Sequence, residues 1–203
     1  MRGSVTFSRF AIEGQVPGNY REEFPGRIRR YGFRDLDEHS DQERSAGWVD
    51  ILDPLDAEFL GEGFFKEGYV ALGLRVDIRV VPAKVLRHHS LMAERELARR
   101  EGLSFLPKER RKELREQVRW KLIRRVIPKS TVYDLVWNLD AGSAILGSTQ
   151  PAICDLFAEH FQKTFGLQAI PLHPHEMMLR AAGRRGWDPQ RISKIQPWSL
   201  PRE

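Results

Sequence analysis

The chain has 203 residues, 41% of them hydrophobic, which predicts one sizeable core or two smaller cores that share an interface. Its 33 Lys and Arg residues exceed its 28 Asp and Glu residues, so the formal net charge is +5, which admits a polyanionic partner without requiring one. The single cysteine, Cys154, excludes a disulfide within the chain, and no apolar run approaches the roughly 18 residues that span a bilayer.

The cellular compartment is indicated by two further features. The N-terminus, from Met1 to Val5, lacks the long apolar core of a signal peptide. Cys154 stands in an apolar run, where a lone cysteine is usually a small buried hydrophobic residue. We therefore expect a cytoplasmic protein without membrane association.

The first fifty residues predict short strands around one helix. Val5 to Ile12 alternates roughly between apolar and polar residues and predicts a half-buried strand. A short helix is expected over Tyr20 to Tyr31, where Pro25 limits its regularity. The polar residues Asp35 to Arg44 predict a surface loop, and strand character returns at Gly47 to Leu52.

Residues 64–81 predict a turn followed by a two-sided strand. The turn is expected at Glu67-Gly68. Beyond it, apolar residues alternate with charged ones: Leu74, Val76, Ile78 and Val80 with Arg75, Asp77 and Arg79. This alternation predicts one dry face and one wet, charged face. Pro82 ends the strand and is suited to open a helix.

The C-terminal part predicts a helical hairpin and then a return to strands. Ala83 to Ile127 forms two helices broken near Gly102 to Ser104, with Pro107 before the second. Further elements are expected in this order: strands at 131–139 and 143–146, a helix at 151–165 ended by Gly166, and a strand at 167–172.

Together these elements predict the α+β class. We expect an antiparallel sheet with a projecting basic helical hairpin at 83–127 and a packed layer of helices. Residues 1–172 would form one domain, and 173–203 a tail with a short helix followed by irregular chain.

Positive charge is concentrated in the hairpin. Between Lys84 and Lys129 stand fifteen basic and six acidic residues, a net charge of +9, so the rest of the chain carries −4. A phosphate backbone attracts such an array, because duplex DNA carries one charge per roughly 1.7 Å. The residues expected to contact phosphates lie in and after the second helix: Lys108, Arg111, Lys112, Arg115, Arg119, Lys121, Arg124, Arg125 and Lys129.

Other interpretations of this segment stay open. Arg111, Arg115 and Arg119 form one stripe at i, i+4 and i+8, but Glu–Arg pairs would equally suit a solvated helix pair without a ligand. Trp120 lies between basic neighbours and is able to stack on bases, although we expect a core position for it. Charge alone does not decide between these alternatives.

Catalytic and metal-binding patterns are not found in the sequence. Two groups of acids, one over Asp35 to Asp41 and one over Asp50 to Glu58, lack the spacing of a metal-dependent nuclease and predict solvated loops. Cys154, His160, His173 and His175 lack zinc-ligand spacing, and His88-His89 are expected at the surface. We find no phosphate-binding glycine loop and no nucleophile elbow. We therefore expect no enzyme activity, metal or cofactor.

The order of several weak motifs resembles the recombination-associated protein RdgC family. These motifs are Gly47-Trp48-Val49, Val80-Val81-Pro82, the charged hairpin ending in Val126-Ile127-Pro128, Trp137-Asn138-Leu139-Asp140 and Ala169-Ile170-Pro171-Leu172. The likeness covers most of 47–172. Two features depart from the family: Asp50-Ile51-Leu52 stands where prolines are usual, and full-length members continue well past Leu172.

The resemblance implies a DNA-binding protein that does not read sequence and that works as a homodimer around duplex DNA. It also implies a nucleoid location and restraint of a RecA-type recombinase. The shorter C-terminus makes a closed ring a weaker expectation than the dimer. The alternative is a protein-interaction module of the same fold that has lost DNA binding and docks another protein through its hairpin and tail.

Overall fold

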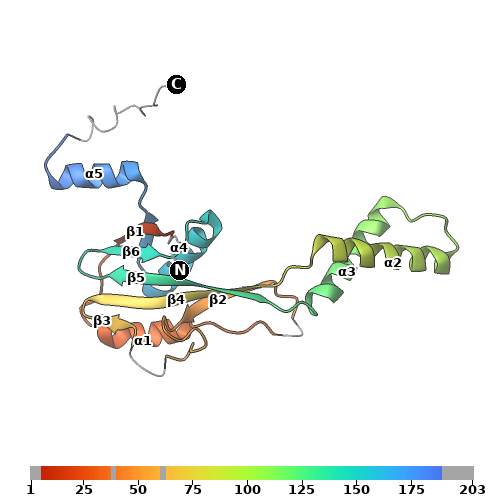
Figure 1. Ribbon diagram of the computed structural model, residues 1–203, viewed down its shortest axis with the longest axis horizontal. Helices are drawn as coiled ribbons and strands as arrows, with labels where there is room; N and C mark the ends of the chain where they lie inside the picture. The colour runs from red at the N-terminus through yellow and green to blue at the C-terminus, as the bar shows by residue number, and fades with distance from the viewer. Residues whose placement is uncertain (1–5, 38–39, 60–62, 189–203) are drawn as a thin grey trace, which may run out of the picture. The chain divides into compact units, whose positions relative to one another are not determined.

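The computed structural model describes residues 6–37, 40–59 and 63–188. Within these ranges the protein is α+β, with a seven-stranded sheet of order β2-β4-β5-β6-β1-β7 in which β3 also pairs with β4 (Figure 1). The strands are β1 (Ser8–Glu13), β2 (Arg44–Val49), β3 (Phe65–Lys66), β4 (Tyr69–Ile78), β5 (Lys129–Asn138), β6 (Ser143–Leu146) and β7 (Gln168–Pro171). The helices are α1 (Tyr20–Arg30), α2 (Ala83–Glu101), α3 (Lys108–Ile123), α4 (Pro151–Phe165) and α5 (Pro174–Arg184). The predicted fold class is confirmed.

The strand pairs with a defined register are antiparallel, namely β1 with β6 and β7, β2 and β3 with β4, and β5 with β6. Residues opposite one another point to the same face of a sheet. Phe10 on β1 is opposite Ala144 on β6, which is opposite Trp137 on β5, and all three are buried. The next residue along each of these strands therefore points to the other face of the sheet.

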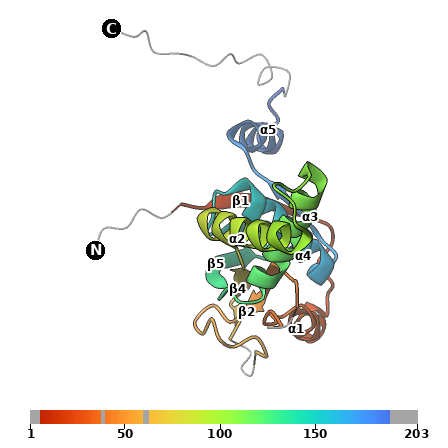
Figure 2. The ribbon, with the colours of Figure 1, turned by 90° about the vertical axis from the view of Figure 1, so that its right-hand side faces the viewer.

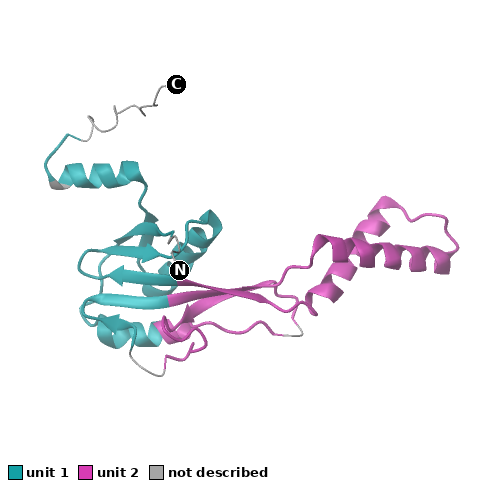
Figure 3. Ribbon diagram, in the orientation of Figure 1, with its two compact units in different colours: residues 1–27, 62–72, 134–203 teal, residues 28–61, 73–133 magenta. Residues whose placement is uncertain are grey.

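The chain divides into two compact units (Figure 3). Unit 1 comprises residues 1–27, 62–72 and 134–203, and unit 2 comprises residues 28–61 and 73–133. Strands β4 and β5 each contribute residues to both units. Each unit contains buried aromatic residues of its own.

The core of unit 1 is an aromatic cluster around Trp137. Its ring stacks on Phe24 of α1 at 5.6 Å between centroids and meets Phe161 and Phe165 of α4 edge-on at 5.0 and 5.2 Å. All four side chains are buried. Because α1 and α4 meet the same residue of β5, they cover one face of the sheet, so the expected helix layer and the structural role of Trp137 are confirmed.

In unit 2 the Gly47-Trp48-Val49 motif packs against the chain that follows α1. The amide of Trp48 donates to the carbonyl of Tyr31, and the amide of Phe33 donates to the carbonyl of Trp48. A Cβ atom on Gly47 would lie 2.4 Å from the Cα of Phe33, so only glycine fits. The motif therefore anchors β2 within unit 2.

The two-sided pattern expected for β4 is wrong at its C-terminal end. Asp77 and Arg79, assigned to the wet face, are 4% and 3% exposed, whereas Ile78 and Val80 are exposed. Asp77 accepts two hydrogen bonds from Arg75, at 2.9 and 3.0 Å, and these bonds raise the pKa of Arg75. Arg79 donates to the main-chain carbonyls of Leu36, Asp37 and Ser40. Burial of these charges is tolerated because each is hydrogen-bonded.

Several boundaries also differ from the predictions. Strand β1 begins at Ser8, whereas Val5 lies outside the described residues. Strand β2 ends at Val49 instead of Leu52, because the Asp50 carboxylate accepts from the amides of Leu52 and Asp53 and forms a turn there. Helix α3 ends at Ile123, before Pro128. The short helix expected after His173 is α5, and the irregular part from 189 onward lies outside the described residues.

Candidate nucleic-acid interface

Helices α2 and α3 form the predicted hairpin between β4 and β5 and pack against each other (Figure 1 and Figure 2). Pro82 precedes α2, where its fixed φ suits entry into a helix. Gly102 ends α2 in the left-handed conformation, at φ 65°. Pro107 then precedes α3. The proline and glycine positions thus explain the break that the sequence predicted.

The hairpin buries few of its side chains. Between residues 83 and 123, the buried ones are Leu86, Ser90, Leu106 and Ile123. Helices that packed into a larger core would bury a continuous apolar stripe. Most of this hairpin is therefore surface, available to solvent or to a partner.

Charges of opposite sign lie on different sides of α3. Basic residues at helical spacing make up what we call the basic stripe: Lys108, Arg111, Lys112, Arg115 and Arg119. Acidic residues at i, i+4 and i+7 make up the acidic stripe: Glu109, Glu113 and Glu116. Trp120 continues the acidic stripe at i+11 and is 40% exposed, so the core position expected for it is wrong.

Four hairpin arginines form ion pairs within the hairpin, and one of them is Arg119, which lies 3.8 Å from Glu116. Glu96 accepts from Arg99 at 2.7 Å and from Arg100 at 2.8 Å, and Glu101 accepts from Arg110 at 2.9 Å. The hydrogen bond from Arg100 is the main cause that lowers the pKa of Glu96. These are the Glu–Arg pairs of a solvated helix pair, and Arg119 is the one residue among them that is predicted to contact phosphate.

Two predicted contact residues are held by carboxylates from outside the hairpin. Arg119 donates to Glu43 at 2.5 Å, and Arg124 lies 2.6 Å from Asp41. The hydrogen bond to Asp41 raises the pKa of Arg124. Both carboxylates belong to the polar loop before β2. A phosphate would have to compete with this loop for the two guanidinium groups.

The other seven predicted contact residues make no ion pair with any described residue: Lys108, Arg111, Lys112, Arg115, Lys121, Arg125 and Lys129. The same holds for Lys84, Arg87 and Arg95 on α2, which the prediction of contacts left out. The helical spacing of two of these cations was visible in the sequence, since Lys84 and Arg95 lie on the same face of α2 as Leu91, at i, i+11 and i+7.

Four of the nine predicted contact residues line one of two surface hollows. Lys121, Arg124 and Arg125 line a hollow of about 380 Å³ together with His89. Arg111 instead lines a hollow of about 290 Å³ with Arg95 of α2. The structure therefore brings the C-terminal cations together but does not gather all nine residues in one hollow.

The acidic group at 50–58 organises its own loop. The Asp50 carboxylate accepts from two backbone amides, Asp53 accepts from the amide of Leu55, and Asp56 accepts from the amides of Glu58 and Phe59. These bonds are the turn-forming kind that Asp makes with nearby backbone. The carboxylates thus have a structural role as loop acids.

The residues considered for zinc do not converge in the described ranges, where no three His, Cys, Asp or Glu side chains are placed to hold a metal ion. Cys154 is half-buried, less than expected, and its thiol lies 3.4 Å from the hydroxyl of Ser8. His88 and His89 are exposed as predicted. Among the helices of the described ranges, none has the length and hydropathy required to cross a membrane.

Comparisons with known proteins add no assignment. No protein-family model matches the chain, and a search of curated proteins finds no match. The resemblance to the RdgC family consequently depends on the order of the motifs in the sequence.

Proposed function

We propose that this protein binds DNA through the phosphate backbone, using the cations of the α2–α3 hairpin, and that it has no catalytic activity. The observation that carries the proposal is the set of seven predicted cations without an ion pair to a described residue, on a hairpin that is mostly surface and has a net charge of +9 over 84–129. When the Lys and Arg side chains of such an array contact phosphates, they displace the counterions that were bound to the DNA.

Binding without sequence preference follows from the residue types. The nine predicted contact residues are all Lys or Arg, and seven of them are exposed and make no ion pair with a described residue. Phosphate contacts position a protein on DNA but carry no sequence information. Reading of bases would need side chains fixed against base edges in a groove.

The resemblance to the RdgC family supports the finer parts of the proposal. By that resemblance the protein acts in recombination or replication, is a homodimer, restrains a RecA-type recombinase and is located at the nucleoid in the cytoplasm. Light scattering tests the assembly. A dimer mass is expected, and a monomer mass at high concentration with DNA binding intact would contradict the homodimer.

The central experiment is a gel shift with unrelated duplex and single-stranded oligonucleotides across a salt series. For duplex DNA, log K is expected to fall with log salt at about −0.9 per neutralised phosphate. Scrambling the sequence should leave the affinity nearly unchanged, and a preference above about a hundredfold would contradict the proposal. Incubation with Mg²⁺ or Mn²⁺ is expected to leave the DNA intact.

The alternative function, a protein-interaction module, is favoured by one observation. The hairpin exposes apolar side chains on both helices and on the connection between them: Val85, Leu91, Met92, Leu103, Phe105 and Trp120. Exposed apolar patches often mark protein interfaces. A purified partner that binds after nuclease treatment, together with absent DNA binding, would favour this second function.

A further inference from the structure

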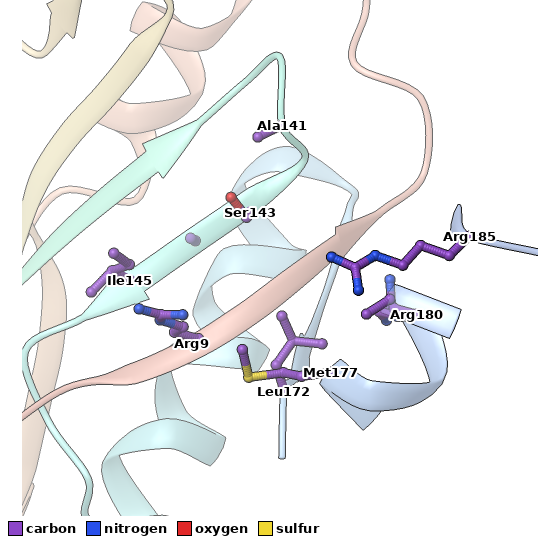
Figure 4. Close-up of a pocket in the computed structure, with 10 residues that line it drawn as sticks. Arg9, Ala141, Ser143, Ile145, Leu172, Met177, Arg180 and Arg185 are labelled. Carbon is purple, nitrogen blue, oxygen red and sulfur yellow. The ribbon is translucent and has the colours of Figure 1, made fainter. Parts of the chain in front are cut away.

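A groove in unit 1 is lined by none of the residues of the proposed DNA interface. It has a volume of about 550 Å³ and lies between α5 and the face of β1 and β6 that α1 and α4 leave uncovered (Figure 4). Small-molecule sites commonly have volumes of about 300–1,000 Å³. The groove is therefore large enough for a small organic ligand.

The sheet side of the groove is formed by neighbouring residues of two strands. Arg9 on β1 is opposite Ile145 on β6, so both side chains point to the face that the helix layer does not cover. Ile145 is exposed, and so is Val136, its neighbour on β5. This row places apolar surface beside a cation.

The helix side is one face of α5 and the residue that follows it. Met177, Arg180, Ala181 and Arg185 line the groove at i, i+3, i+4 and i+8. In Figure 4, Arg180 and Arg185 lie at one side of the hollow, Arg9 and Ile145 at the other, and Leu172 and Met177 between them. The groove thus has an apolar middle part flanked by arginines.

The three arginines are not equivalent. Arg180 is paired with Glu13 at 2.7 Å, a contact that ties α5 to β1. Arg9 and Arg185 make no ion pair with any described residue and lie instead near the rings of Phe7 and Trp187. Two cations therefore face the groove without a carboxylate partner in the described part of the chain.

The apolar surface continues into a second hollow. This hollow has a volume of about 500 Å³ and shares Arg9, Leu172 and Met177 with the first. It adds the exposed ring of Phe7 and the half-buried Cys154. An extended alkyl chain that lies on Leu172 and Met177 would therefore contact the apolar surface of both hollows.

We propose that this groove binds a soluble single-chain amphipathic carboxylate, such as a medium-chain fatty acid. The carboxylate pairs with Arg185, and the alkyl chain lies on Leu172 and Met177 and extends toward Ile145 at the other side of the groove. Arginine suits a carboxylate because its planar fork donates two parallel hydrogen bonds. The proposal is independent of DNA binding, because the groove belongs to unit 1 and the hairpin to unit 2.

Isothermal titration calorimetry of the whole chain tests the proposal with three probes: decanoate, its neutral analogue decanol, and acetate. Decanoate is expected to bind saturably and more tightly than both others, since only decanoate has both the charge and the chain. From octanoate to dodecanoate the affinity should rise, by up to about fourfold per methylene. Equal affinity for decanol and decanoate, or no saturable binding of decanoate, would overturn the proposal.

Variants locate the binding to the groove. Arg185→Gln is expected to lower decanoate affinity about two- to fivefold, in the range of exposed ion pairs, whereas Arg9→Gln, at the opposite side of the groove, should lower it less. Met177→Gln should flatten the chain-length dependence. Lys66→Gln, which removes an exposed cation that does not line the groove, is the matched control and should bind as the natural chain does. Wild-type decanoate affinity in the Arg185→Gln variant would overturn the proposal, as would binding to anionic vesicles without binding to decanoate.

Discussion

The guanidinium of Arg119 donates a hydrogen bond to the carboxylate of Glu43 at 2.5 Å, although 76 positions separate the two residues in the chain. Arg124 makes the corresponding contact with Asp41. These pairs attach the C-terminal part of α3 and the residue that follows it to the loop that precedes β2. They also occupy two of the nine cations that the sequence assigns to DNA, so the loop and the DNA compete for the same groups.

Removing the competing carboxylates should strengthen DNA binding. In the double variant Asp41→Asn, Glu43→Gln, the affinity for duplex DNA is expected to rise for all sequences alike. The salt slope should steepen by up to about two units, because Arg119 and Arg124 become able to neutralise phosphates. Fluorescence anisotropy across a salt series measures both quantities.

The matched control for that variant is Glu159→Gln, which removes an exposed carboxylate paired with Lys163 on α4 of unit 1. It raises the net charge without freeing a hairpin cation, so its effect on the slope should be small. If the double variant binds DNA like the natural chain, while the natural chain itself binds, the loop does not compete for the interface.

Loss of the unpaired part of the basic stripe should weaken DNA binding. Replacing Arg111 and Arg115 with Gln keeps helix propensity nearly level, so folding should survive. The salt slope is expected to fall by up to about two units. Adding Arg119→Gln should change it less, because Glu43 already holds Arg119. The control Arg99→Gln, Arg100→Gln removes cations that pair with Glu96 and should have a smaller effect.

The stability of unit 1 should depend strongly on Trp137. Its ring is fully buried between Phe24 and the α4 aromatics, so Trp137→Ala is expected to lower the free energy of unfolding by about 3–5 kcal/mol. Trp137→Phe should cost less, because the indole N–H has no hydrogen-bond partner in the described structure. Urea denaturation measures the difference. Val136→Ala, at an exposed position of the same strand, is the control, and a loss as large as that of Trp137→Ala would contradict this assignment.

The ionisation of Glu96 should report the ion pairs of α2. Its pKa lies below the ordinary value, chiefly because Arg100 donates a hydrogen bond to it. Such a carboxylate stabilises the fold above its ordinary pKa, and this contribution is lost as the pH falls through the lowered pKa. Arg100→Gln is expected to raise the pKa of Glu96, as followed by carbon-detected NMR titration. Arg95→Gln should leave it nearly unchanged, and equal shifts in the two variants would contradict the assignment.

The order and type of the elements followed from local patterns. The break between α2 and α3 is determined by Gly102 and Pro107, and the end of α4 by Gly166, because these residues restrict or permit particular backbone angles wherever they stand. The excess of positive charge between Lys84 and Lys129 is likewise a property of the sequence alone. These features predicted both the α+β class and the location of the candidate interface.

Contacts between distant segments decided the rest. Alternation predicted that Asp77 and Arg79 face water, yet Arg79 donates to carbonyls of Leu36, Asp37 and Ser40, and Arg75 pairs with Asp77. The period of a strand distinguishes its two faces, but it contains no information about which loop will cover a residue. The same reason explains Trp120, which lies on the exposed acidic stripe of α3 instead of in a core.

For the candidate site, the residue types and the helical spacing of the cations were determined by the sequence itself. Which of those cations keep their charge available was decided only by the fold, because the carboxylates that hold Arg119 and Arg124 come from positions 43 and 41. An ion pair requires that two groups lie within a few ångströms of each other. The two pairs here join residues separated by 76 and by 83 positions in the sequence, and such residues come that close only when the chain has folded.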